Sequence, residues 1–122
     1  MKKILIVEDD QFIRDIYEEV LKDEGYQITC ASDGQKGYEE MKKKSYDLVL
    51  LDIMLPKLDG IDILQKLQKE GKLKQSKTIF LLTNLSGEAI MKKKGRIEVD
   101  EYLIKSSLTP DKLVEKIKAY LK

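Results

Sequence analysis

Residues 47–52 read Asp-Leu-Val-Leu-Leu-Asp, and this stretch decides the fold class. Its four middle residues are aliphatic without polar alternation, which is typical of a strand buried on both faces. Strands of this kind lie in the middle of parallel sheets that carry helices on both sides. The stretch therefore predicts a central strand over Asp47–Leu51, followed directly by a carboxylate, Asp52.

Strand and helix patterns alternate along the rest of the chain. Four further stretches have the short, apolar composition of strands: Lys3–Val7, Tyr26–Ala31, Lys77–Leu82 and Val99–Ile104. Helical patterns cover residues 12–21, 33–44, 61–67, 86–94 and 109–121, of which 86–94 is the weakest. Strict alternation predicts an α/β domain with a five-stranded parallel sheet and right-handed crossovers.

The first and last helices carry the clearest signals. Phe12 and Tyr17 belong to the apolar stripe predicted for the first helix, and Tyr120 belongs to that of the last. Asp33 is predicted to cap the second helix. Thr109, followed by proline and an acid, is predicted to cap the last one.

Length and composition exclude several classes of protein. A chain of 122 residues forms one domain, here 1–122, and its apolar runs are too short for membrane insertion. The acids after Val7 end the only stretch that resembles a signal sequence, so we expect a cytoplasmic protein. One cysteine and no histidine argue against a zinc site and exclude nucleophilic catalysis that depends on histidine.

Charge is distributed unevenly along the chain. Residues 1–61 carry 9 basic and 14 acidic side chains, whereas residues 62–122 carry 14 basic and 8 acidic ones. Such asymmetry can steer a partner of opposite charge. The lysine triplets at 42–44 and 92–94 are expected to be solvated helix ends, because cations suit that end of the helix dipole.

Polar residues follow the predicted strands where parallel sheets of this kind bind ligands. Glu8 and Asp9 follow the first strand and Asp52 the third, and these strands are expected to be neighbours. Two carboxylates about 5 Å apart repel by about 3 kcal/mol at an effective dielectric of 20, so a cation is needed. Oxygen ligands with room for water suit Mg²⁺, or Mn²⁺. Thr83 and Lys105 complete a pocket for a transferring phosphoryl group, with Asp52 as its nucleophile.

Each of these residues also has an ordinary structural interpretation. Asp10 is more simply a helix cap than a metal ligand. Glu8 and Asp9 fit solvated strand ends, Thr83 fits a strand, and Lys105 fits the surface. Their joint placement at separate strand ends is what favours the functional hypothesis.

The sequence resembles the receiver domain of two-component response regulators over essentially its whole length. The resemblance rests on four stretches: Ile4–Asp10, Asp52–Gly60, Leu82–Thr83 and Tyr102–Lys105. It implies a flavodoxin-like, doubly wound (βα)5 fold with strand order 2-1-3-4-5. It also implies a phosphorylation-activated signalling switch rather than an enzyme that turns over external substrates.

The resemblance assigns roles to the acidic residues. Asp52 would accept a phosphoryl group from the phosphohistidine of a sensor histidine kinase or phosphotransfer protein. Glu8 and Asp9 would form the acidic pair. Asp9 and Asp52 would bind Mg²⁺ together with the backbone carbonyl of Met54.

It also assigns the residues that carry the response. Thr83 would close on the phosphoryl oxygen, Lys105 would pair with it, and Tyr102 would be the aromatic switch residue. The output would be altered binding of a protein target, or homodimerisation, through the face formed by 86–94, 99–104 and 109–121. The alternative for Tyr102 is a β-preferring residue packed at the sheet edge.

Three departures from the family pattern bear on these roles. Ser106 follows Lys105 where the family usually has proline after a cis peptide, so we expect a trans bond with a rerouted loop or a strained cis bond. Asn84 replaces a smaller residue after the threonine. Residues 95–100 lack the usual Gly-Ala-Asp before the last strand.

Three other functions are compatible with a fold of this class or with its acidic residues. A flavodoxin-type electron carrier would need a phosphate loop after the first strand, where Glu8 and Asp9 would repel the phosphate. An aspartate-nucleophile phosphohydrolase would need a second acid where Met54 stands. A docking module that cannot be phosphorylated would not need the intact acid pair. Since the chain ends after the last helix, we expect no direct nucleic-acid binding from these residues.

Overall fold

The computed structural model describes residues 1–95 and 97–121, apart from the side chains of Leu85 and Ser86. The strands are β1 (Lys3–Val7), β2 (Gln27–Ala31), β3 (Leu48–Asp52), β4 (Ile79–Thr83) and β5 (Glu101–Ile104). The helices are α1 (Gln11–Asp23), α2 (Gly34–Lys43), α3 (Gly60–Lys69), α4 (Leu85–Lys94) and α5 (Pro110–Tyr120). Short 3-10 turns cover η1 (Leu73–Gln75) and η2 (Lys105–Ser107).

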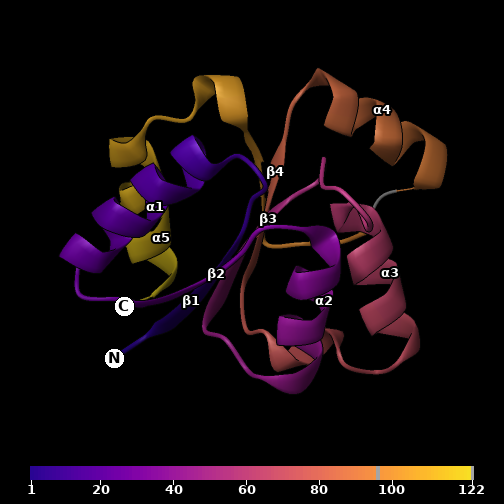
Figure 1. Ribbon diagram of the computed structural model, residues 1–122, viewed down its shortest axis with the longest axis horizontal. Coiled ribbons are helices and arrows are strands. Elements are labelled where there is room, and N and C mark those ends of the chain that lie inside the picture. The colour runs from indigo at the N-terminus through magenta and orange to yellow at the C-terminus, as the bar shows by residue number, and fades with distance from the viewer. Residues whose placement is uncertain (96, 122) are drawn as a thin grey trace.

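The five strands form one parallel sheet in the order β2-β1-β3-β4-β5. Helices α1 and α5 cover one face, and α2, α3 and α4 cover the other (Figure 1). The predicted flavodoxin-like α/β fold and its strand order are confirmed. The register of β1 and β3 is the feature that matters for function, because it pairs Val7 with Leu51 and brings the residues that follow them together.

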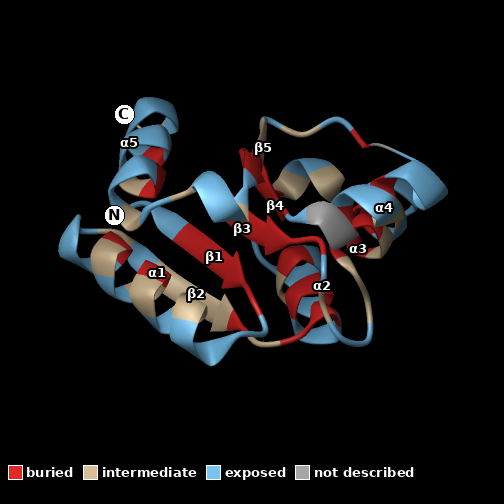
Figure 2. Ribbon diagram, turned by 90° about the horizontal axis from the view of Figure 1, so that it is seen from above, coloured by how far each residue is buried: buried red, intermediate tan, exposed pale blue. Residues whose placement is uncertain are grey.

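The alternation of side chains along β3 builds both halves of the core. Leu48 and Leu50 pack with α1 and α5, whereas Val49 and Leu51 pack with α2, α3 and α4. All four are fully buried, β3 and β4 are buried along their whole length, and β1 is buried except at its first residue (Figure 2). Burying a side chain of this size contributes about 1.5–3 kcal/mol, so the strand that ends at Asp52 is held rigidly from both sides.

Three predicted helix caps are confirmed. The carboxylate of Asp10 accepts a hydrogen bond from the Ile13 amide at 3.1 Å, and that of Asp33 accepts one from Lys36 at 2.8 Å. The hydroxyl of Thr109 accepts one from the Lys112 amide at 3.2 Å. Asp10 therefore has the structural role that its position indicated.

Strand boundaries differ from the prediction for identifiable reasons. β2 begins at Gln27 because the Tyr26 amide donates to the carbonyl of Leu21 at the end of α1. β5 begins at Glu101 because Asp100 uses its carboxylate, as well as its amide, to bond Ile79. Asp52 itself belongs to β3, where it pairs with Leu82.

The prediction that Phe12 packs in the core is wrong. Its side chain is 75% exposed, whereas Tyr17 and Leu21 are buried. At about 100° per residue, Phe12 lies about 140° from Tyr17 and about 180° from Leu21 around the helix. Tyr120 is 41% exposed, although its ring meets that of Phe80 edge to face at 5.0 Å.

No helix within the described residues is both long enough and apolar enough to cross a membrane.

Candidate functional site

A cavity of about 420 Å³ opens where the carboxyl ends of β1 and β3 meet. Parallel sheets of this topology bind ligands at such a point, where the strand order reverses. Acidic residues and loop residues after β3 both line it. The residues that line it are Glu8, Asp9, Asp10, Ile13, Asp52, Met54, Leu55, Pro56, Asn84 and Lys105.

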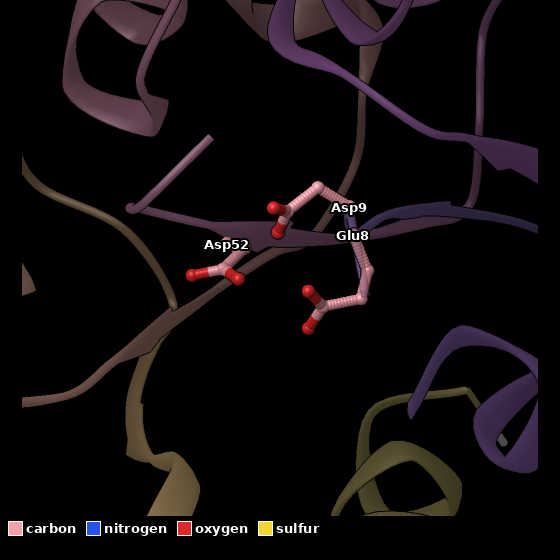
Figure 3. Close-up of side chains that lie close together, drawn as sticks. All are labelled: Glu8, Asp9 and Asp52. Atoms are coloured by element: carbon pink, nitrogen blue, oxygen red, sulfur yellow. The ribbon is translucent and has the colours of Figure 1, made fainter. Parts of the chain in front are cut away.

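Three carboxyl groups converge in this cavity. One carboxylate oxygen each from Glu8, Asp9 and Asp52 lies within 4.8 Å of the other two, as Figure 3 illustrates. Glu8 is completely buried and Asp52 is 2% exposed, whereas Asp9 reaches solvent. Buried like charges at this spacing repel strongly, so the folded chain must supply positive charge or donors to offset them.

Asp52 receives a donor on each of its carboxylate oxygens. The ammonium of Lys105 contacts Oδ2 at 2.8 Å, and the backbone amide of Met54 donates to Oδ1 at 3.1 Å. Because Asp52 ends a strand buried on both faces, its backbone cannot move far, and these two donors orient its side chain. Each carboxylate oxygen accepts two bonds, so both retain capacity towards the cavity.

Lys105 also contacts the second buried acid. Its Nζ atom lies 2.7 Å from Oε1 of Glu8. Burial opposes its charged form, but its hydrogen bonds to Asp52 and Glu8 hold the pKa of Lys105 above its ordinary value. This lysine is therefore a permanent cation between two carboxylates and not the solvated side chain of the ordinary interpretation.

The pKa values of the other two acids, Glu8 and Asp9, are raised by their surroundings. Burial raises the pKa of Glu8 despite the Lys105 hydrogen bond that opposes the shift, and the charge of Asp52 adds to the rise. Partial burial of its carboxyl, together with the Glu8 carboxylate, raises the pKa of Asp9. Negative charge is thus in excess at the cavity mouth, where one lysine does not neutralise three acids.

The donor set fits Mg²⁺ or Mn²⁺. Both ions prefer hard oxygen ligands, and the three oxygens are close enough together to reach one ion with room for water. The same set lacks nitrogen or sulfur donors, which zinc prefers. Met54 also lines the cavity, and its amide donates to Asp52.

The backbone after Lys105 takes the trans form. Lys105–Ser106 is trans, as is every other described peptide bond, and residues Lys105–Ser107 form the short turn η2. Of the two geometries expected for this bond, the structure therefore has the trans bond. The long side chain of Lys105 still reaches Asp52.

Thr83 and Tyr102 lie beside the cavity rather than in it. The Thr83 side chain, 2% exposed, donates its hydroxyl to the backbone carbonyl of Asn84 at 3.0 Å. Tyr102 is half-buried on β5, and its hydroxyl donates to the carbonyl of Ile97. The structure therefore places both predicted switch residues outside the residues that line the cavity, and neither of these two hydrogen bonds involves Asp52.

Sequence reasoning missed Arg14. Its guanidinium donates to the backbone carbonyl of Glu8 at 2.8 Å and to that of Asp9 at 3.4 Å. These bonds hold the turn that carries the acid pair and bring a positive charge behind it. Arg14 lies four residues after the Asp10 cap, one helical turn away, which is the only sequence signal for this contact.

Comparison with known proteins agrees with this geometry. Residues 4–118 match the response regulator receiver domain family. A curated relative from Pyropia yezoensis, described as probable transcriptional regulator ycf27, is 37% identical over 99% of this chain and 48% of its own length. The chain spans about half the length of the curated relatives it matches.

Solved structures show the same fold. A CheY-like receiver domain protein from Methanospirillum hungatei is 31% identical, with a TM-score of 0.79, and the match covers 99% of this chain and 94% of that one. The response regulator TrrA from Thermotoga maritima, solved in complex with Mg²⁺ and BeF, is 34% identical, with a TM-score of 0.76. That match covers 98% of this chain and 99% of the other.

The acid cluster at the strand ends, the lysine that joins Asp52 to Glu8, and the match over 4–118 lead to one conclusion. This chain belongs to the response regulator receiver domain family and is a receiver domain of a two-component response regulator.

Proposed function

We propose that the chain is a signalling switch that is activated when Asp52 takes a phosphoryl group from a histidine kinase or phosphotransfer protein. The observation that carries the proposal is the placement of Asp52. This buried carboxylate opens into a cavity, is oriented by Met54 and Lys105, and stands beside two further acids. The match to TrrA, solved with Mg²⁺ and BeF, supports the same role.

The chemistry requires little beyond positioning. A carboxylate oxygen of Asp52 attacks phosphorus, the P–N bond of the phosphohistidine breaks, and the histidine nitrogen leaves with the bonding electrons. An ionised carboxylate needs no base to remove a proton, which fits a chain without histidine. The buried strand β3 holds the nucleophile in place while the donor protein approaches from the cavity side.

Lys105 stabilises the charge that the transfer brings in. Its ammonium already contacts Asp52 Oδ2 at 2.8 Å and is tied to Glu8, so it needs little reorganisation to meet a phosphoryl oxygen. Preorganised donors of this kind stabilise developing negative charge most strongly where water is excluded. The raised pKa of Lys105 keeps it charged throughout the physiological range.

Glu8, Asp9 and Asp52, with the Met54 carbonyl, would hold the divalent cation. Bound there, Mg²⁺ or Mn²⁺ would neutralise phosphoryl oxygens and offset repulsion among the acids. The residues themselves fit this task, because Glu8 is fixed by Lys105 while Asp9 reaches solvent at the cavity mouth.

The output is proposed to be a change of protein binding through α4, β5 and α5. Thr83 ends β4 beside α4, and Tyr102 lies on β5, so a movement of the threonine towards Asp52 alters packing at this surface. A target protein or a second copy of the chain would bind there. We place this switch in the cytoplasm, where histidine kinases act, and assign it no direct contact with nucleic acid.

Intact-mass spectrometry tests the proposal. The chain is incubated with Mg²⁺ and a small phosphodonor such as acetyl phosphate, and one phosphoryl group should add to the wild type. Asp52→Asn should add none, and Asp9→Asn should add much less. Asp47→Asn, which directly precedes β3 at the end opposite Asp52, is the matched control and should label normally. Labelling of Asp52→Asn to the wild-type extent would refute the assignment.

A further inference from the structure

Gly87 lies in the first turn of α4, where its backbone gives no reason for a glycine. The described glycines with positive φ are Gly25, Gly71 and Gly95, so Gly87 adopts a conformation open to any residue. Glycine is the poorest helix former after proline. Its presence at a buried helical position therefore needs another cause.

The space that a side chain at position 87 would need is occupied by Thr83. A Cβ atom on residue 87 would lie 2.6 Å from Oγ1 of Thr83 and 3.3 Å from Cβ of Ile53. Real Cβ atoms essentially never approach another heavy atom within 3.0 Å. Ile53 is fully buried and cannot withdraw, so the Thr83 hydroxyl is the group that would have to move.

The Thr83 hydroxyl is held on the α4 side of the strand end. It donates to the carbonyl of Asn84, and the Asn84 side chain accepts a bond from the Gly87 amide at 2.9 Å. Thr83 is not among the described residues that line the cavity over Asp52. The first turn of α4 thus forms the site that this hydroxyl occupies, which we call its seat. Because Gly87 has no side chain, it leaves the space in which the hydroxyl lies.

We propose that Gly87 is a positioning residue of the switch, which provides the resting place of the Thr83 hydroxyl and so sets how readily that hydroxyl leaves for Asp52. The inference rests on the proposed function in one respect, that Thr83 closes on the phosphoryl group. A threonine side chain has three staggered positions about its one χ1 bond. A methyl group at position 87 removes the one seen here.

The test is a double-mutant cycle between positions 83 and 87. Gly87→Ala should destabilise only the resting state, in which the Thr83 hydroxyl occupies the seat. In the activated state the hydroxyl has moved to Asp52, so the added methyl group no longer meets it. Calorimetric titration with beryllofluoride and Mg²⁺, a phosphoryl mimic, should show affinity tighter by about fivefold or more in Gly87→Ala. When Thr83→Ala is also present, the same substitution should change affinity by less than about twofold.

Melting temperature gives a second cycle that needs no phosphoryl mimic. In the Thr83→Ala background, Gly87→Ala should raise the melting temperature, because alanine favours the helix and nothing obstructs it. In the wild-type background that gain should be reduced or reversed. Because Thr83→Ser keeps the hydroxyl, Gly87→Ala should change the melting temperature in a Thr83→Ser background as it does in the wild-type background. Ala89→Gly, exposed on the same helix, should lower stability equally in both backgrounds.

The two cycles separate failure of this inference from failure of the proposed function. If Gly87→Ala changes the melting temperature equally with and without Thr83→Ala, Gly87 does not provide the site of the Thr83 hydroxyl, and the inference is refuted. If the melting temperatures show coupling but beryllofluoride binds no variant, the seat stands and the proposed phosphoryl site fails. If beryllofluoride binds and Gly87→Ala leaves its affinity unchanged, the positioning role is refuted.

Discussion

Lys105 and Asp52, 53 positions apart in sequence, meet through a 2.8 Å contact between Nζ and Oδ2, with Glu8 on the other side of the ammonium at 2.7 Å. The lysine side chain and both carboxylates are largely buried. A cation between two buried acids has a structural role before it has a chemical one, because each partner would be destabilising alone.

Removing that cation should destabilise the fold. Lys105→Met leaves Glu8 and Asp52 facing each other without a counter-ion, and we expect the free energy of unfolding to fall by about 3 kcal/mol. Urea denaturation measures it. Lys116→Ala, which breaks the exposed pair with Glu101, should cost less than about 1 kcal/mol. If the two substitutions cost the same, the buried contact does not have this role.

Mg²⁺ should stabilise the unphosphorylated protein, because the folded chain assembles oxygens that the unfolded chain keeps apart. At a hundredfold excess over its dissociation constant, the gain is about 2.7 kcal/mol, which raises the melting temperature by several degrees. Asp9→Asn should lose most of this rise, whereas Asp15→Asn, at an exposed position of α1, should keep it. A melting temperature that Mg²⁺ leaves unchanged would contradict a metal site here.

Lys94 should anchor the far end of α4. Its ammonium contacts Asp59 at 2.7 Å and Asp62 at 2.8 Å, the two residues of the capping box that begins α3. Since the lysine is partly exposed, we expect Lys94→Ala to cost about 1 kcal/mol. Hydrogen exchange should accelerate in the last turn of α4. Lys93→Ala, which breaks no ion pair within the described structure, should leave exchange unchanged.

Cys30 should react slowly in the folded protein. Burial between the sheet and its helices raises the pKa of the Cys30 thiol from 9.0 to about 11, with the Glu18 carboxylate adding to the shift. A raised pKa lowers the thiolate fraction at pH 8 by about a hundredfold, and only the thiolate alkylates. Iodoacetamide should therefore label Cys30 far more slowly in the folded protein than in the protein unfolded in urea, both at pH 8. Equal labelling rates would show that the thiol is accessible in the folded protein and would contradict this prediction.

The sequence predicted the features of the fold and the site that follow from the pattern of apolar and polar side chains. The apolar run before Asp52 indicated a strand buried on both faces, and the order of strands and helices indicated where strand ends would meet. That was sufficient to bring Asp52, Glu8, Asp9 and Lys105 into one prediction. In the structure the three carboxylates converge to within 4.8 Å, and Lys105 contacts Asp52 and Glu8.

Side-chain bonds to backbone carbonyls were beyond such reasoning, although the bonds of the helix caps to backbone amides were not. Arg14 donates to two main-chain carbonyls, and Tyr102 donates to the carbonyl of Ile97. Every residue has such a carbonyl, so the sequence does not indicate which one a side chain will bond. Lys94 was expected to be solvated, but its partners lie on α3, which only the packing of two helices brings near. Gly87 gave no signal at all, because its effect depends on the position of one hydroxyl.

Reductive mapping of the phosphorylated residue tests the central claim most directly. Sodium borohydride reduces an acyl phosphate, but not a free carboxylate, to an alcohol, so a phosphorylated aspartate becomes homoserine. After labelling with acetyl phosphate and Mg²⁺, peptide mass spectrometry should find homoserine at position 52 alone. Homoserine at Asp9 or another acid, or none in a chain that carries the phosphoryl mass, would contradict Asp52 as the acceptor.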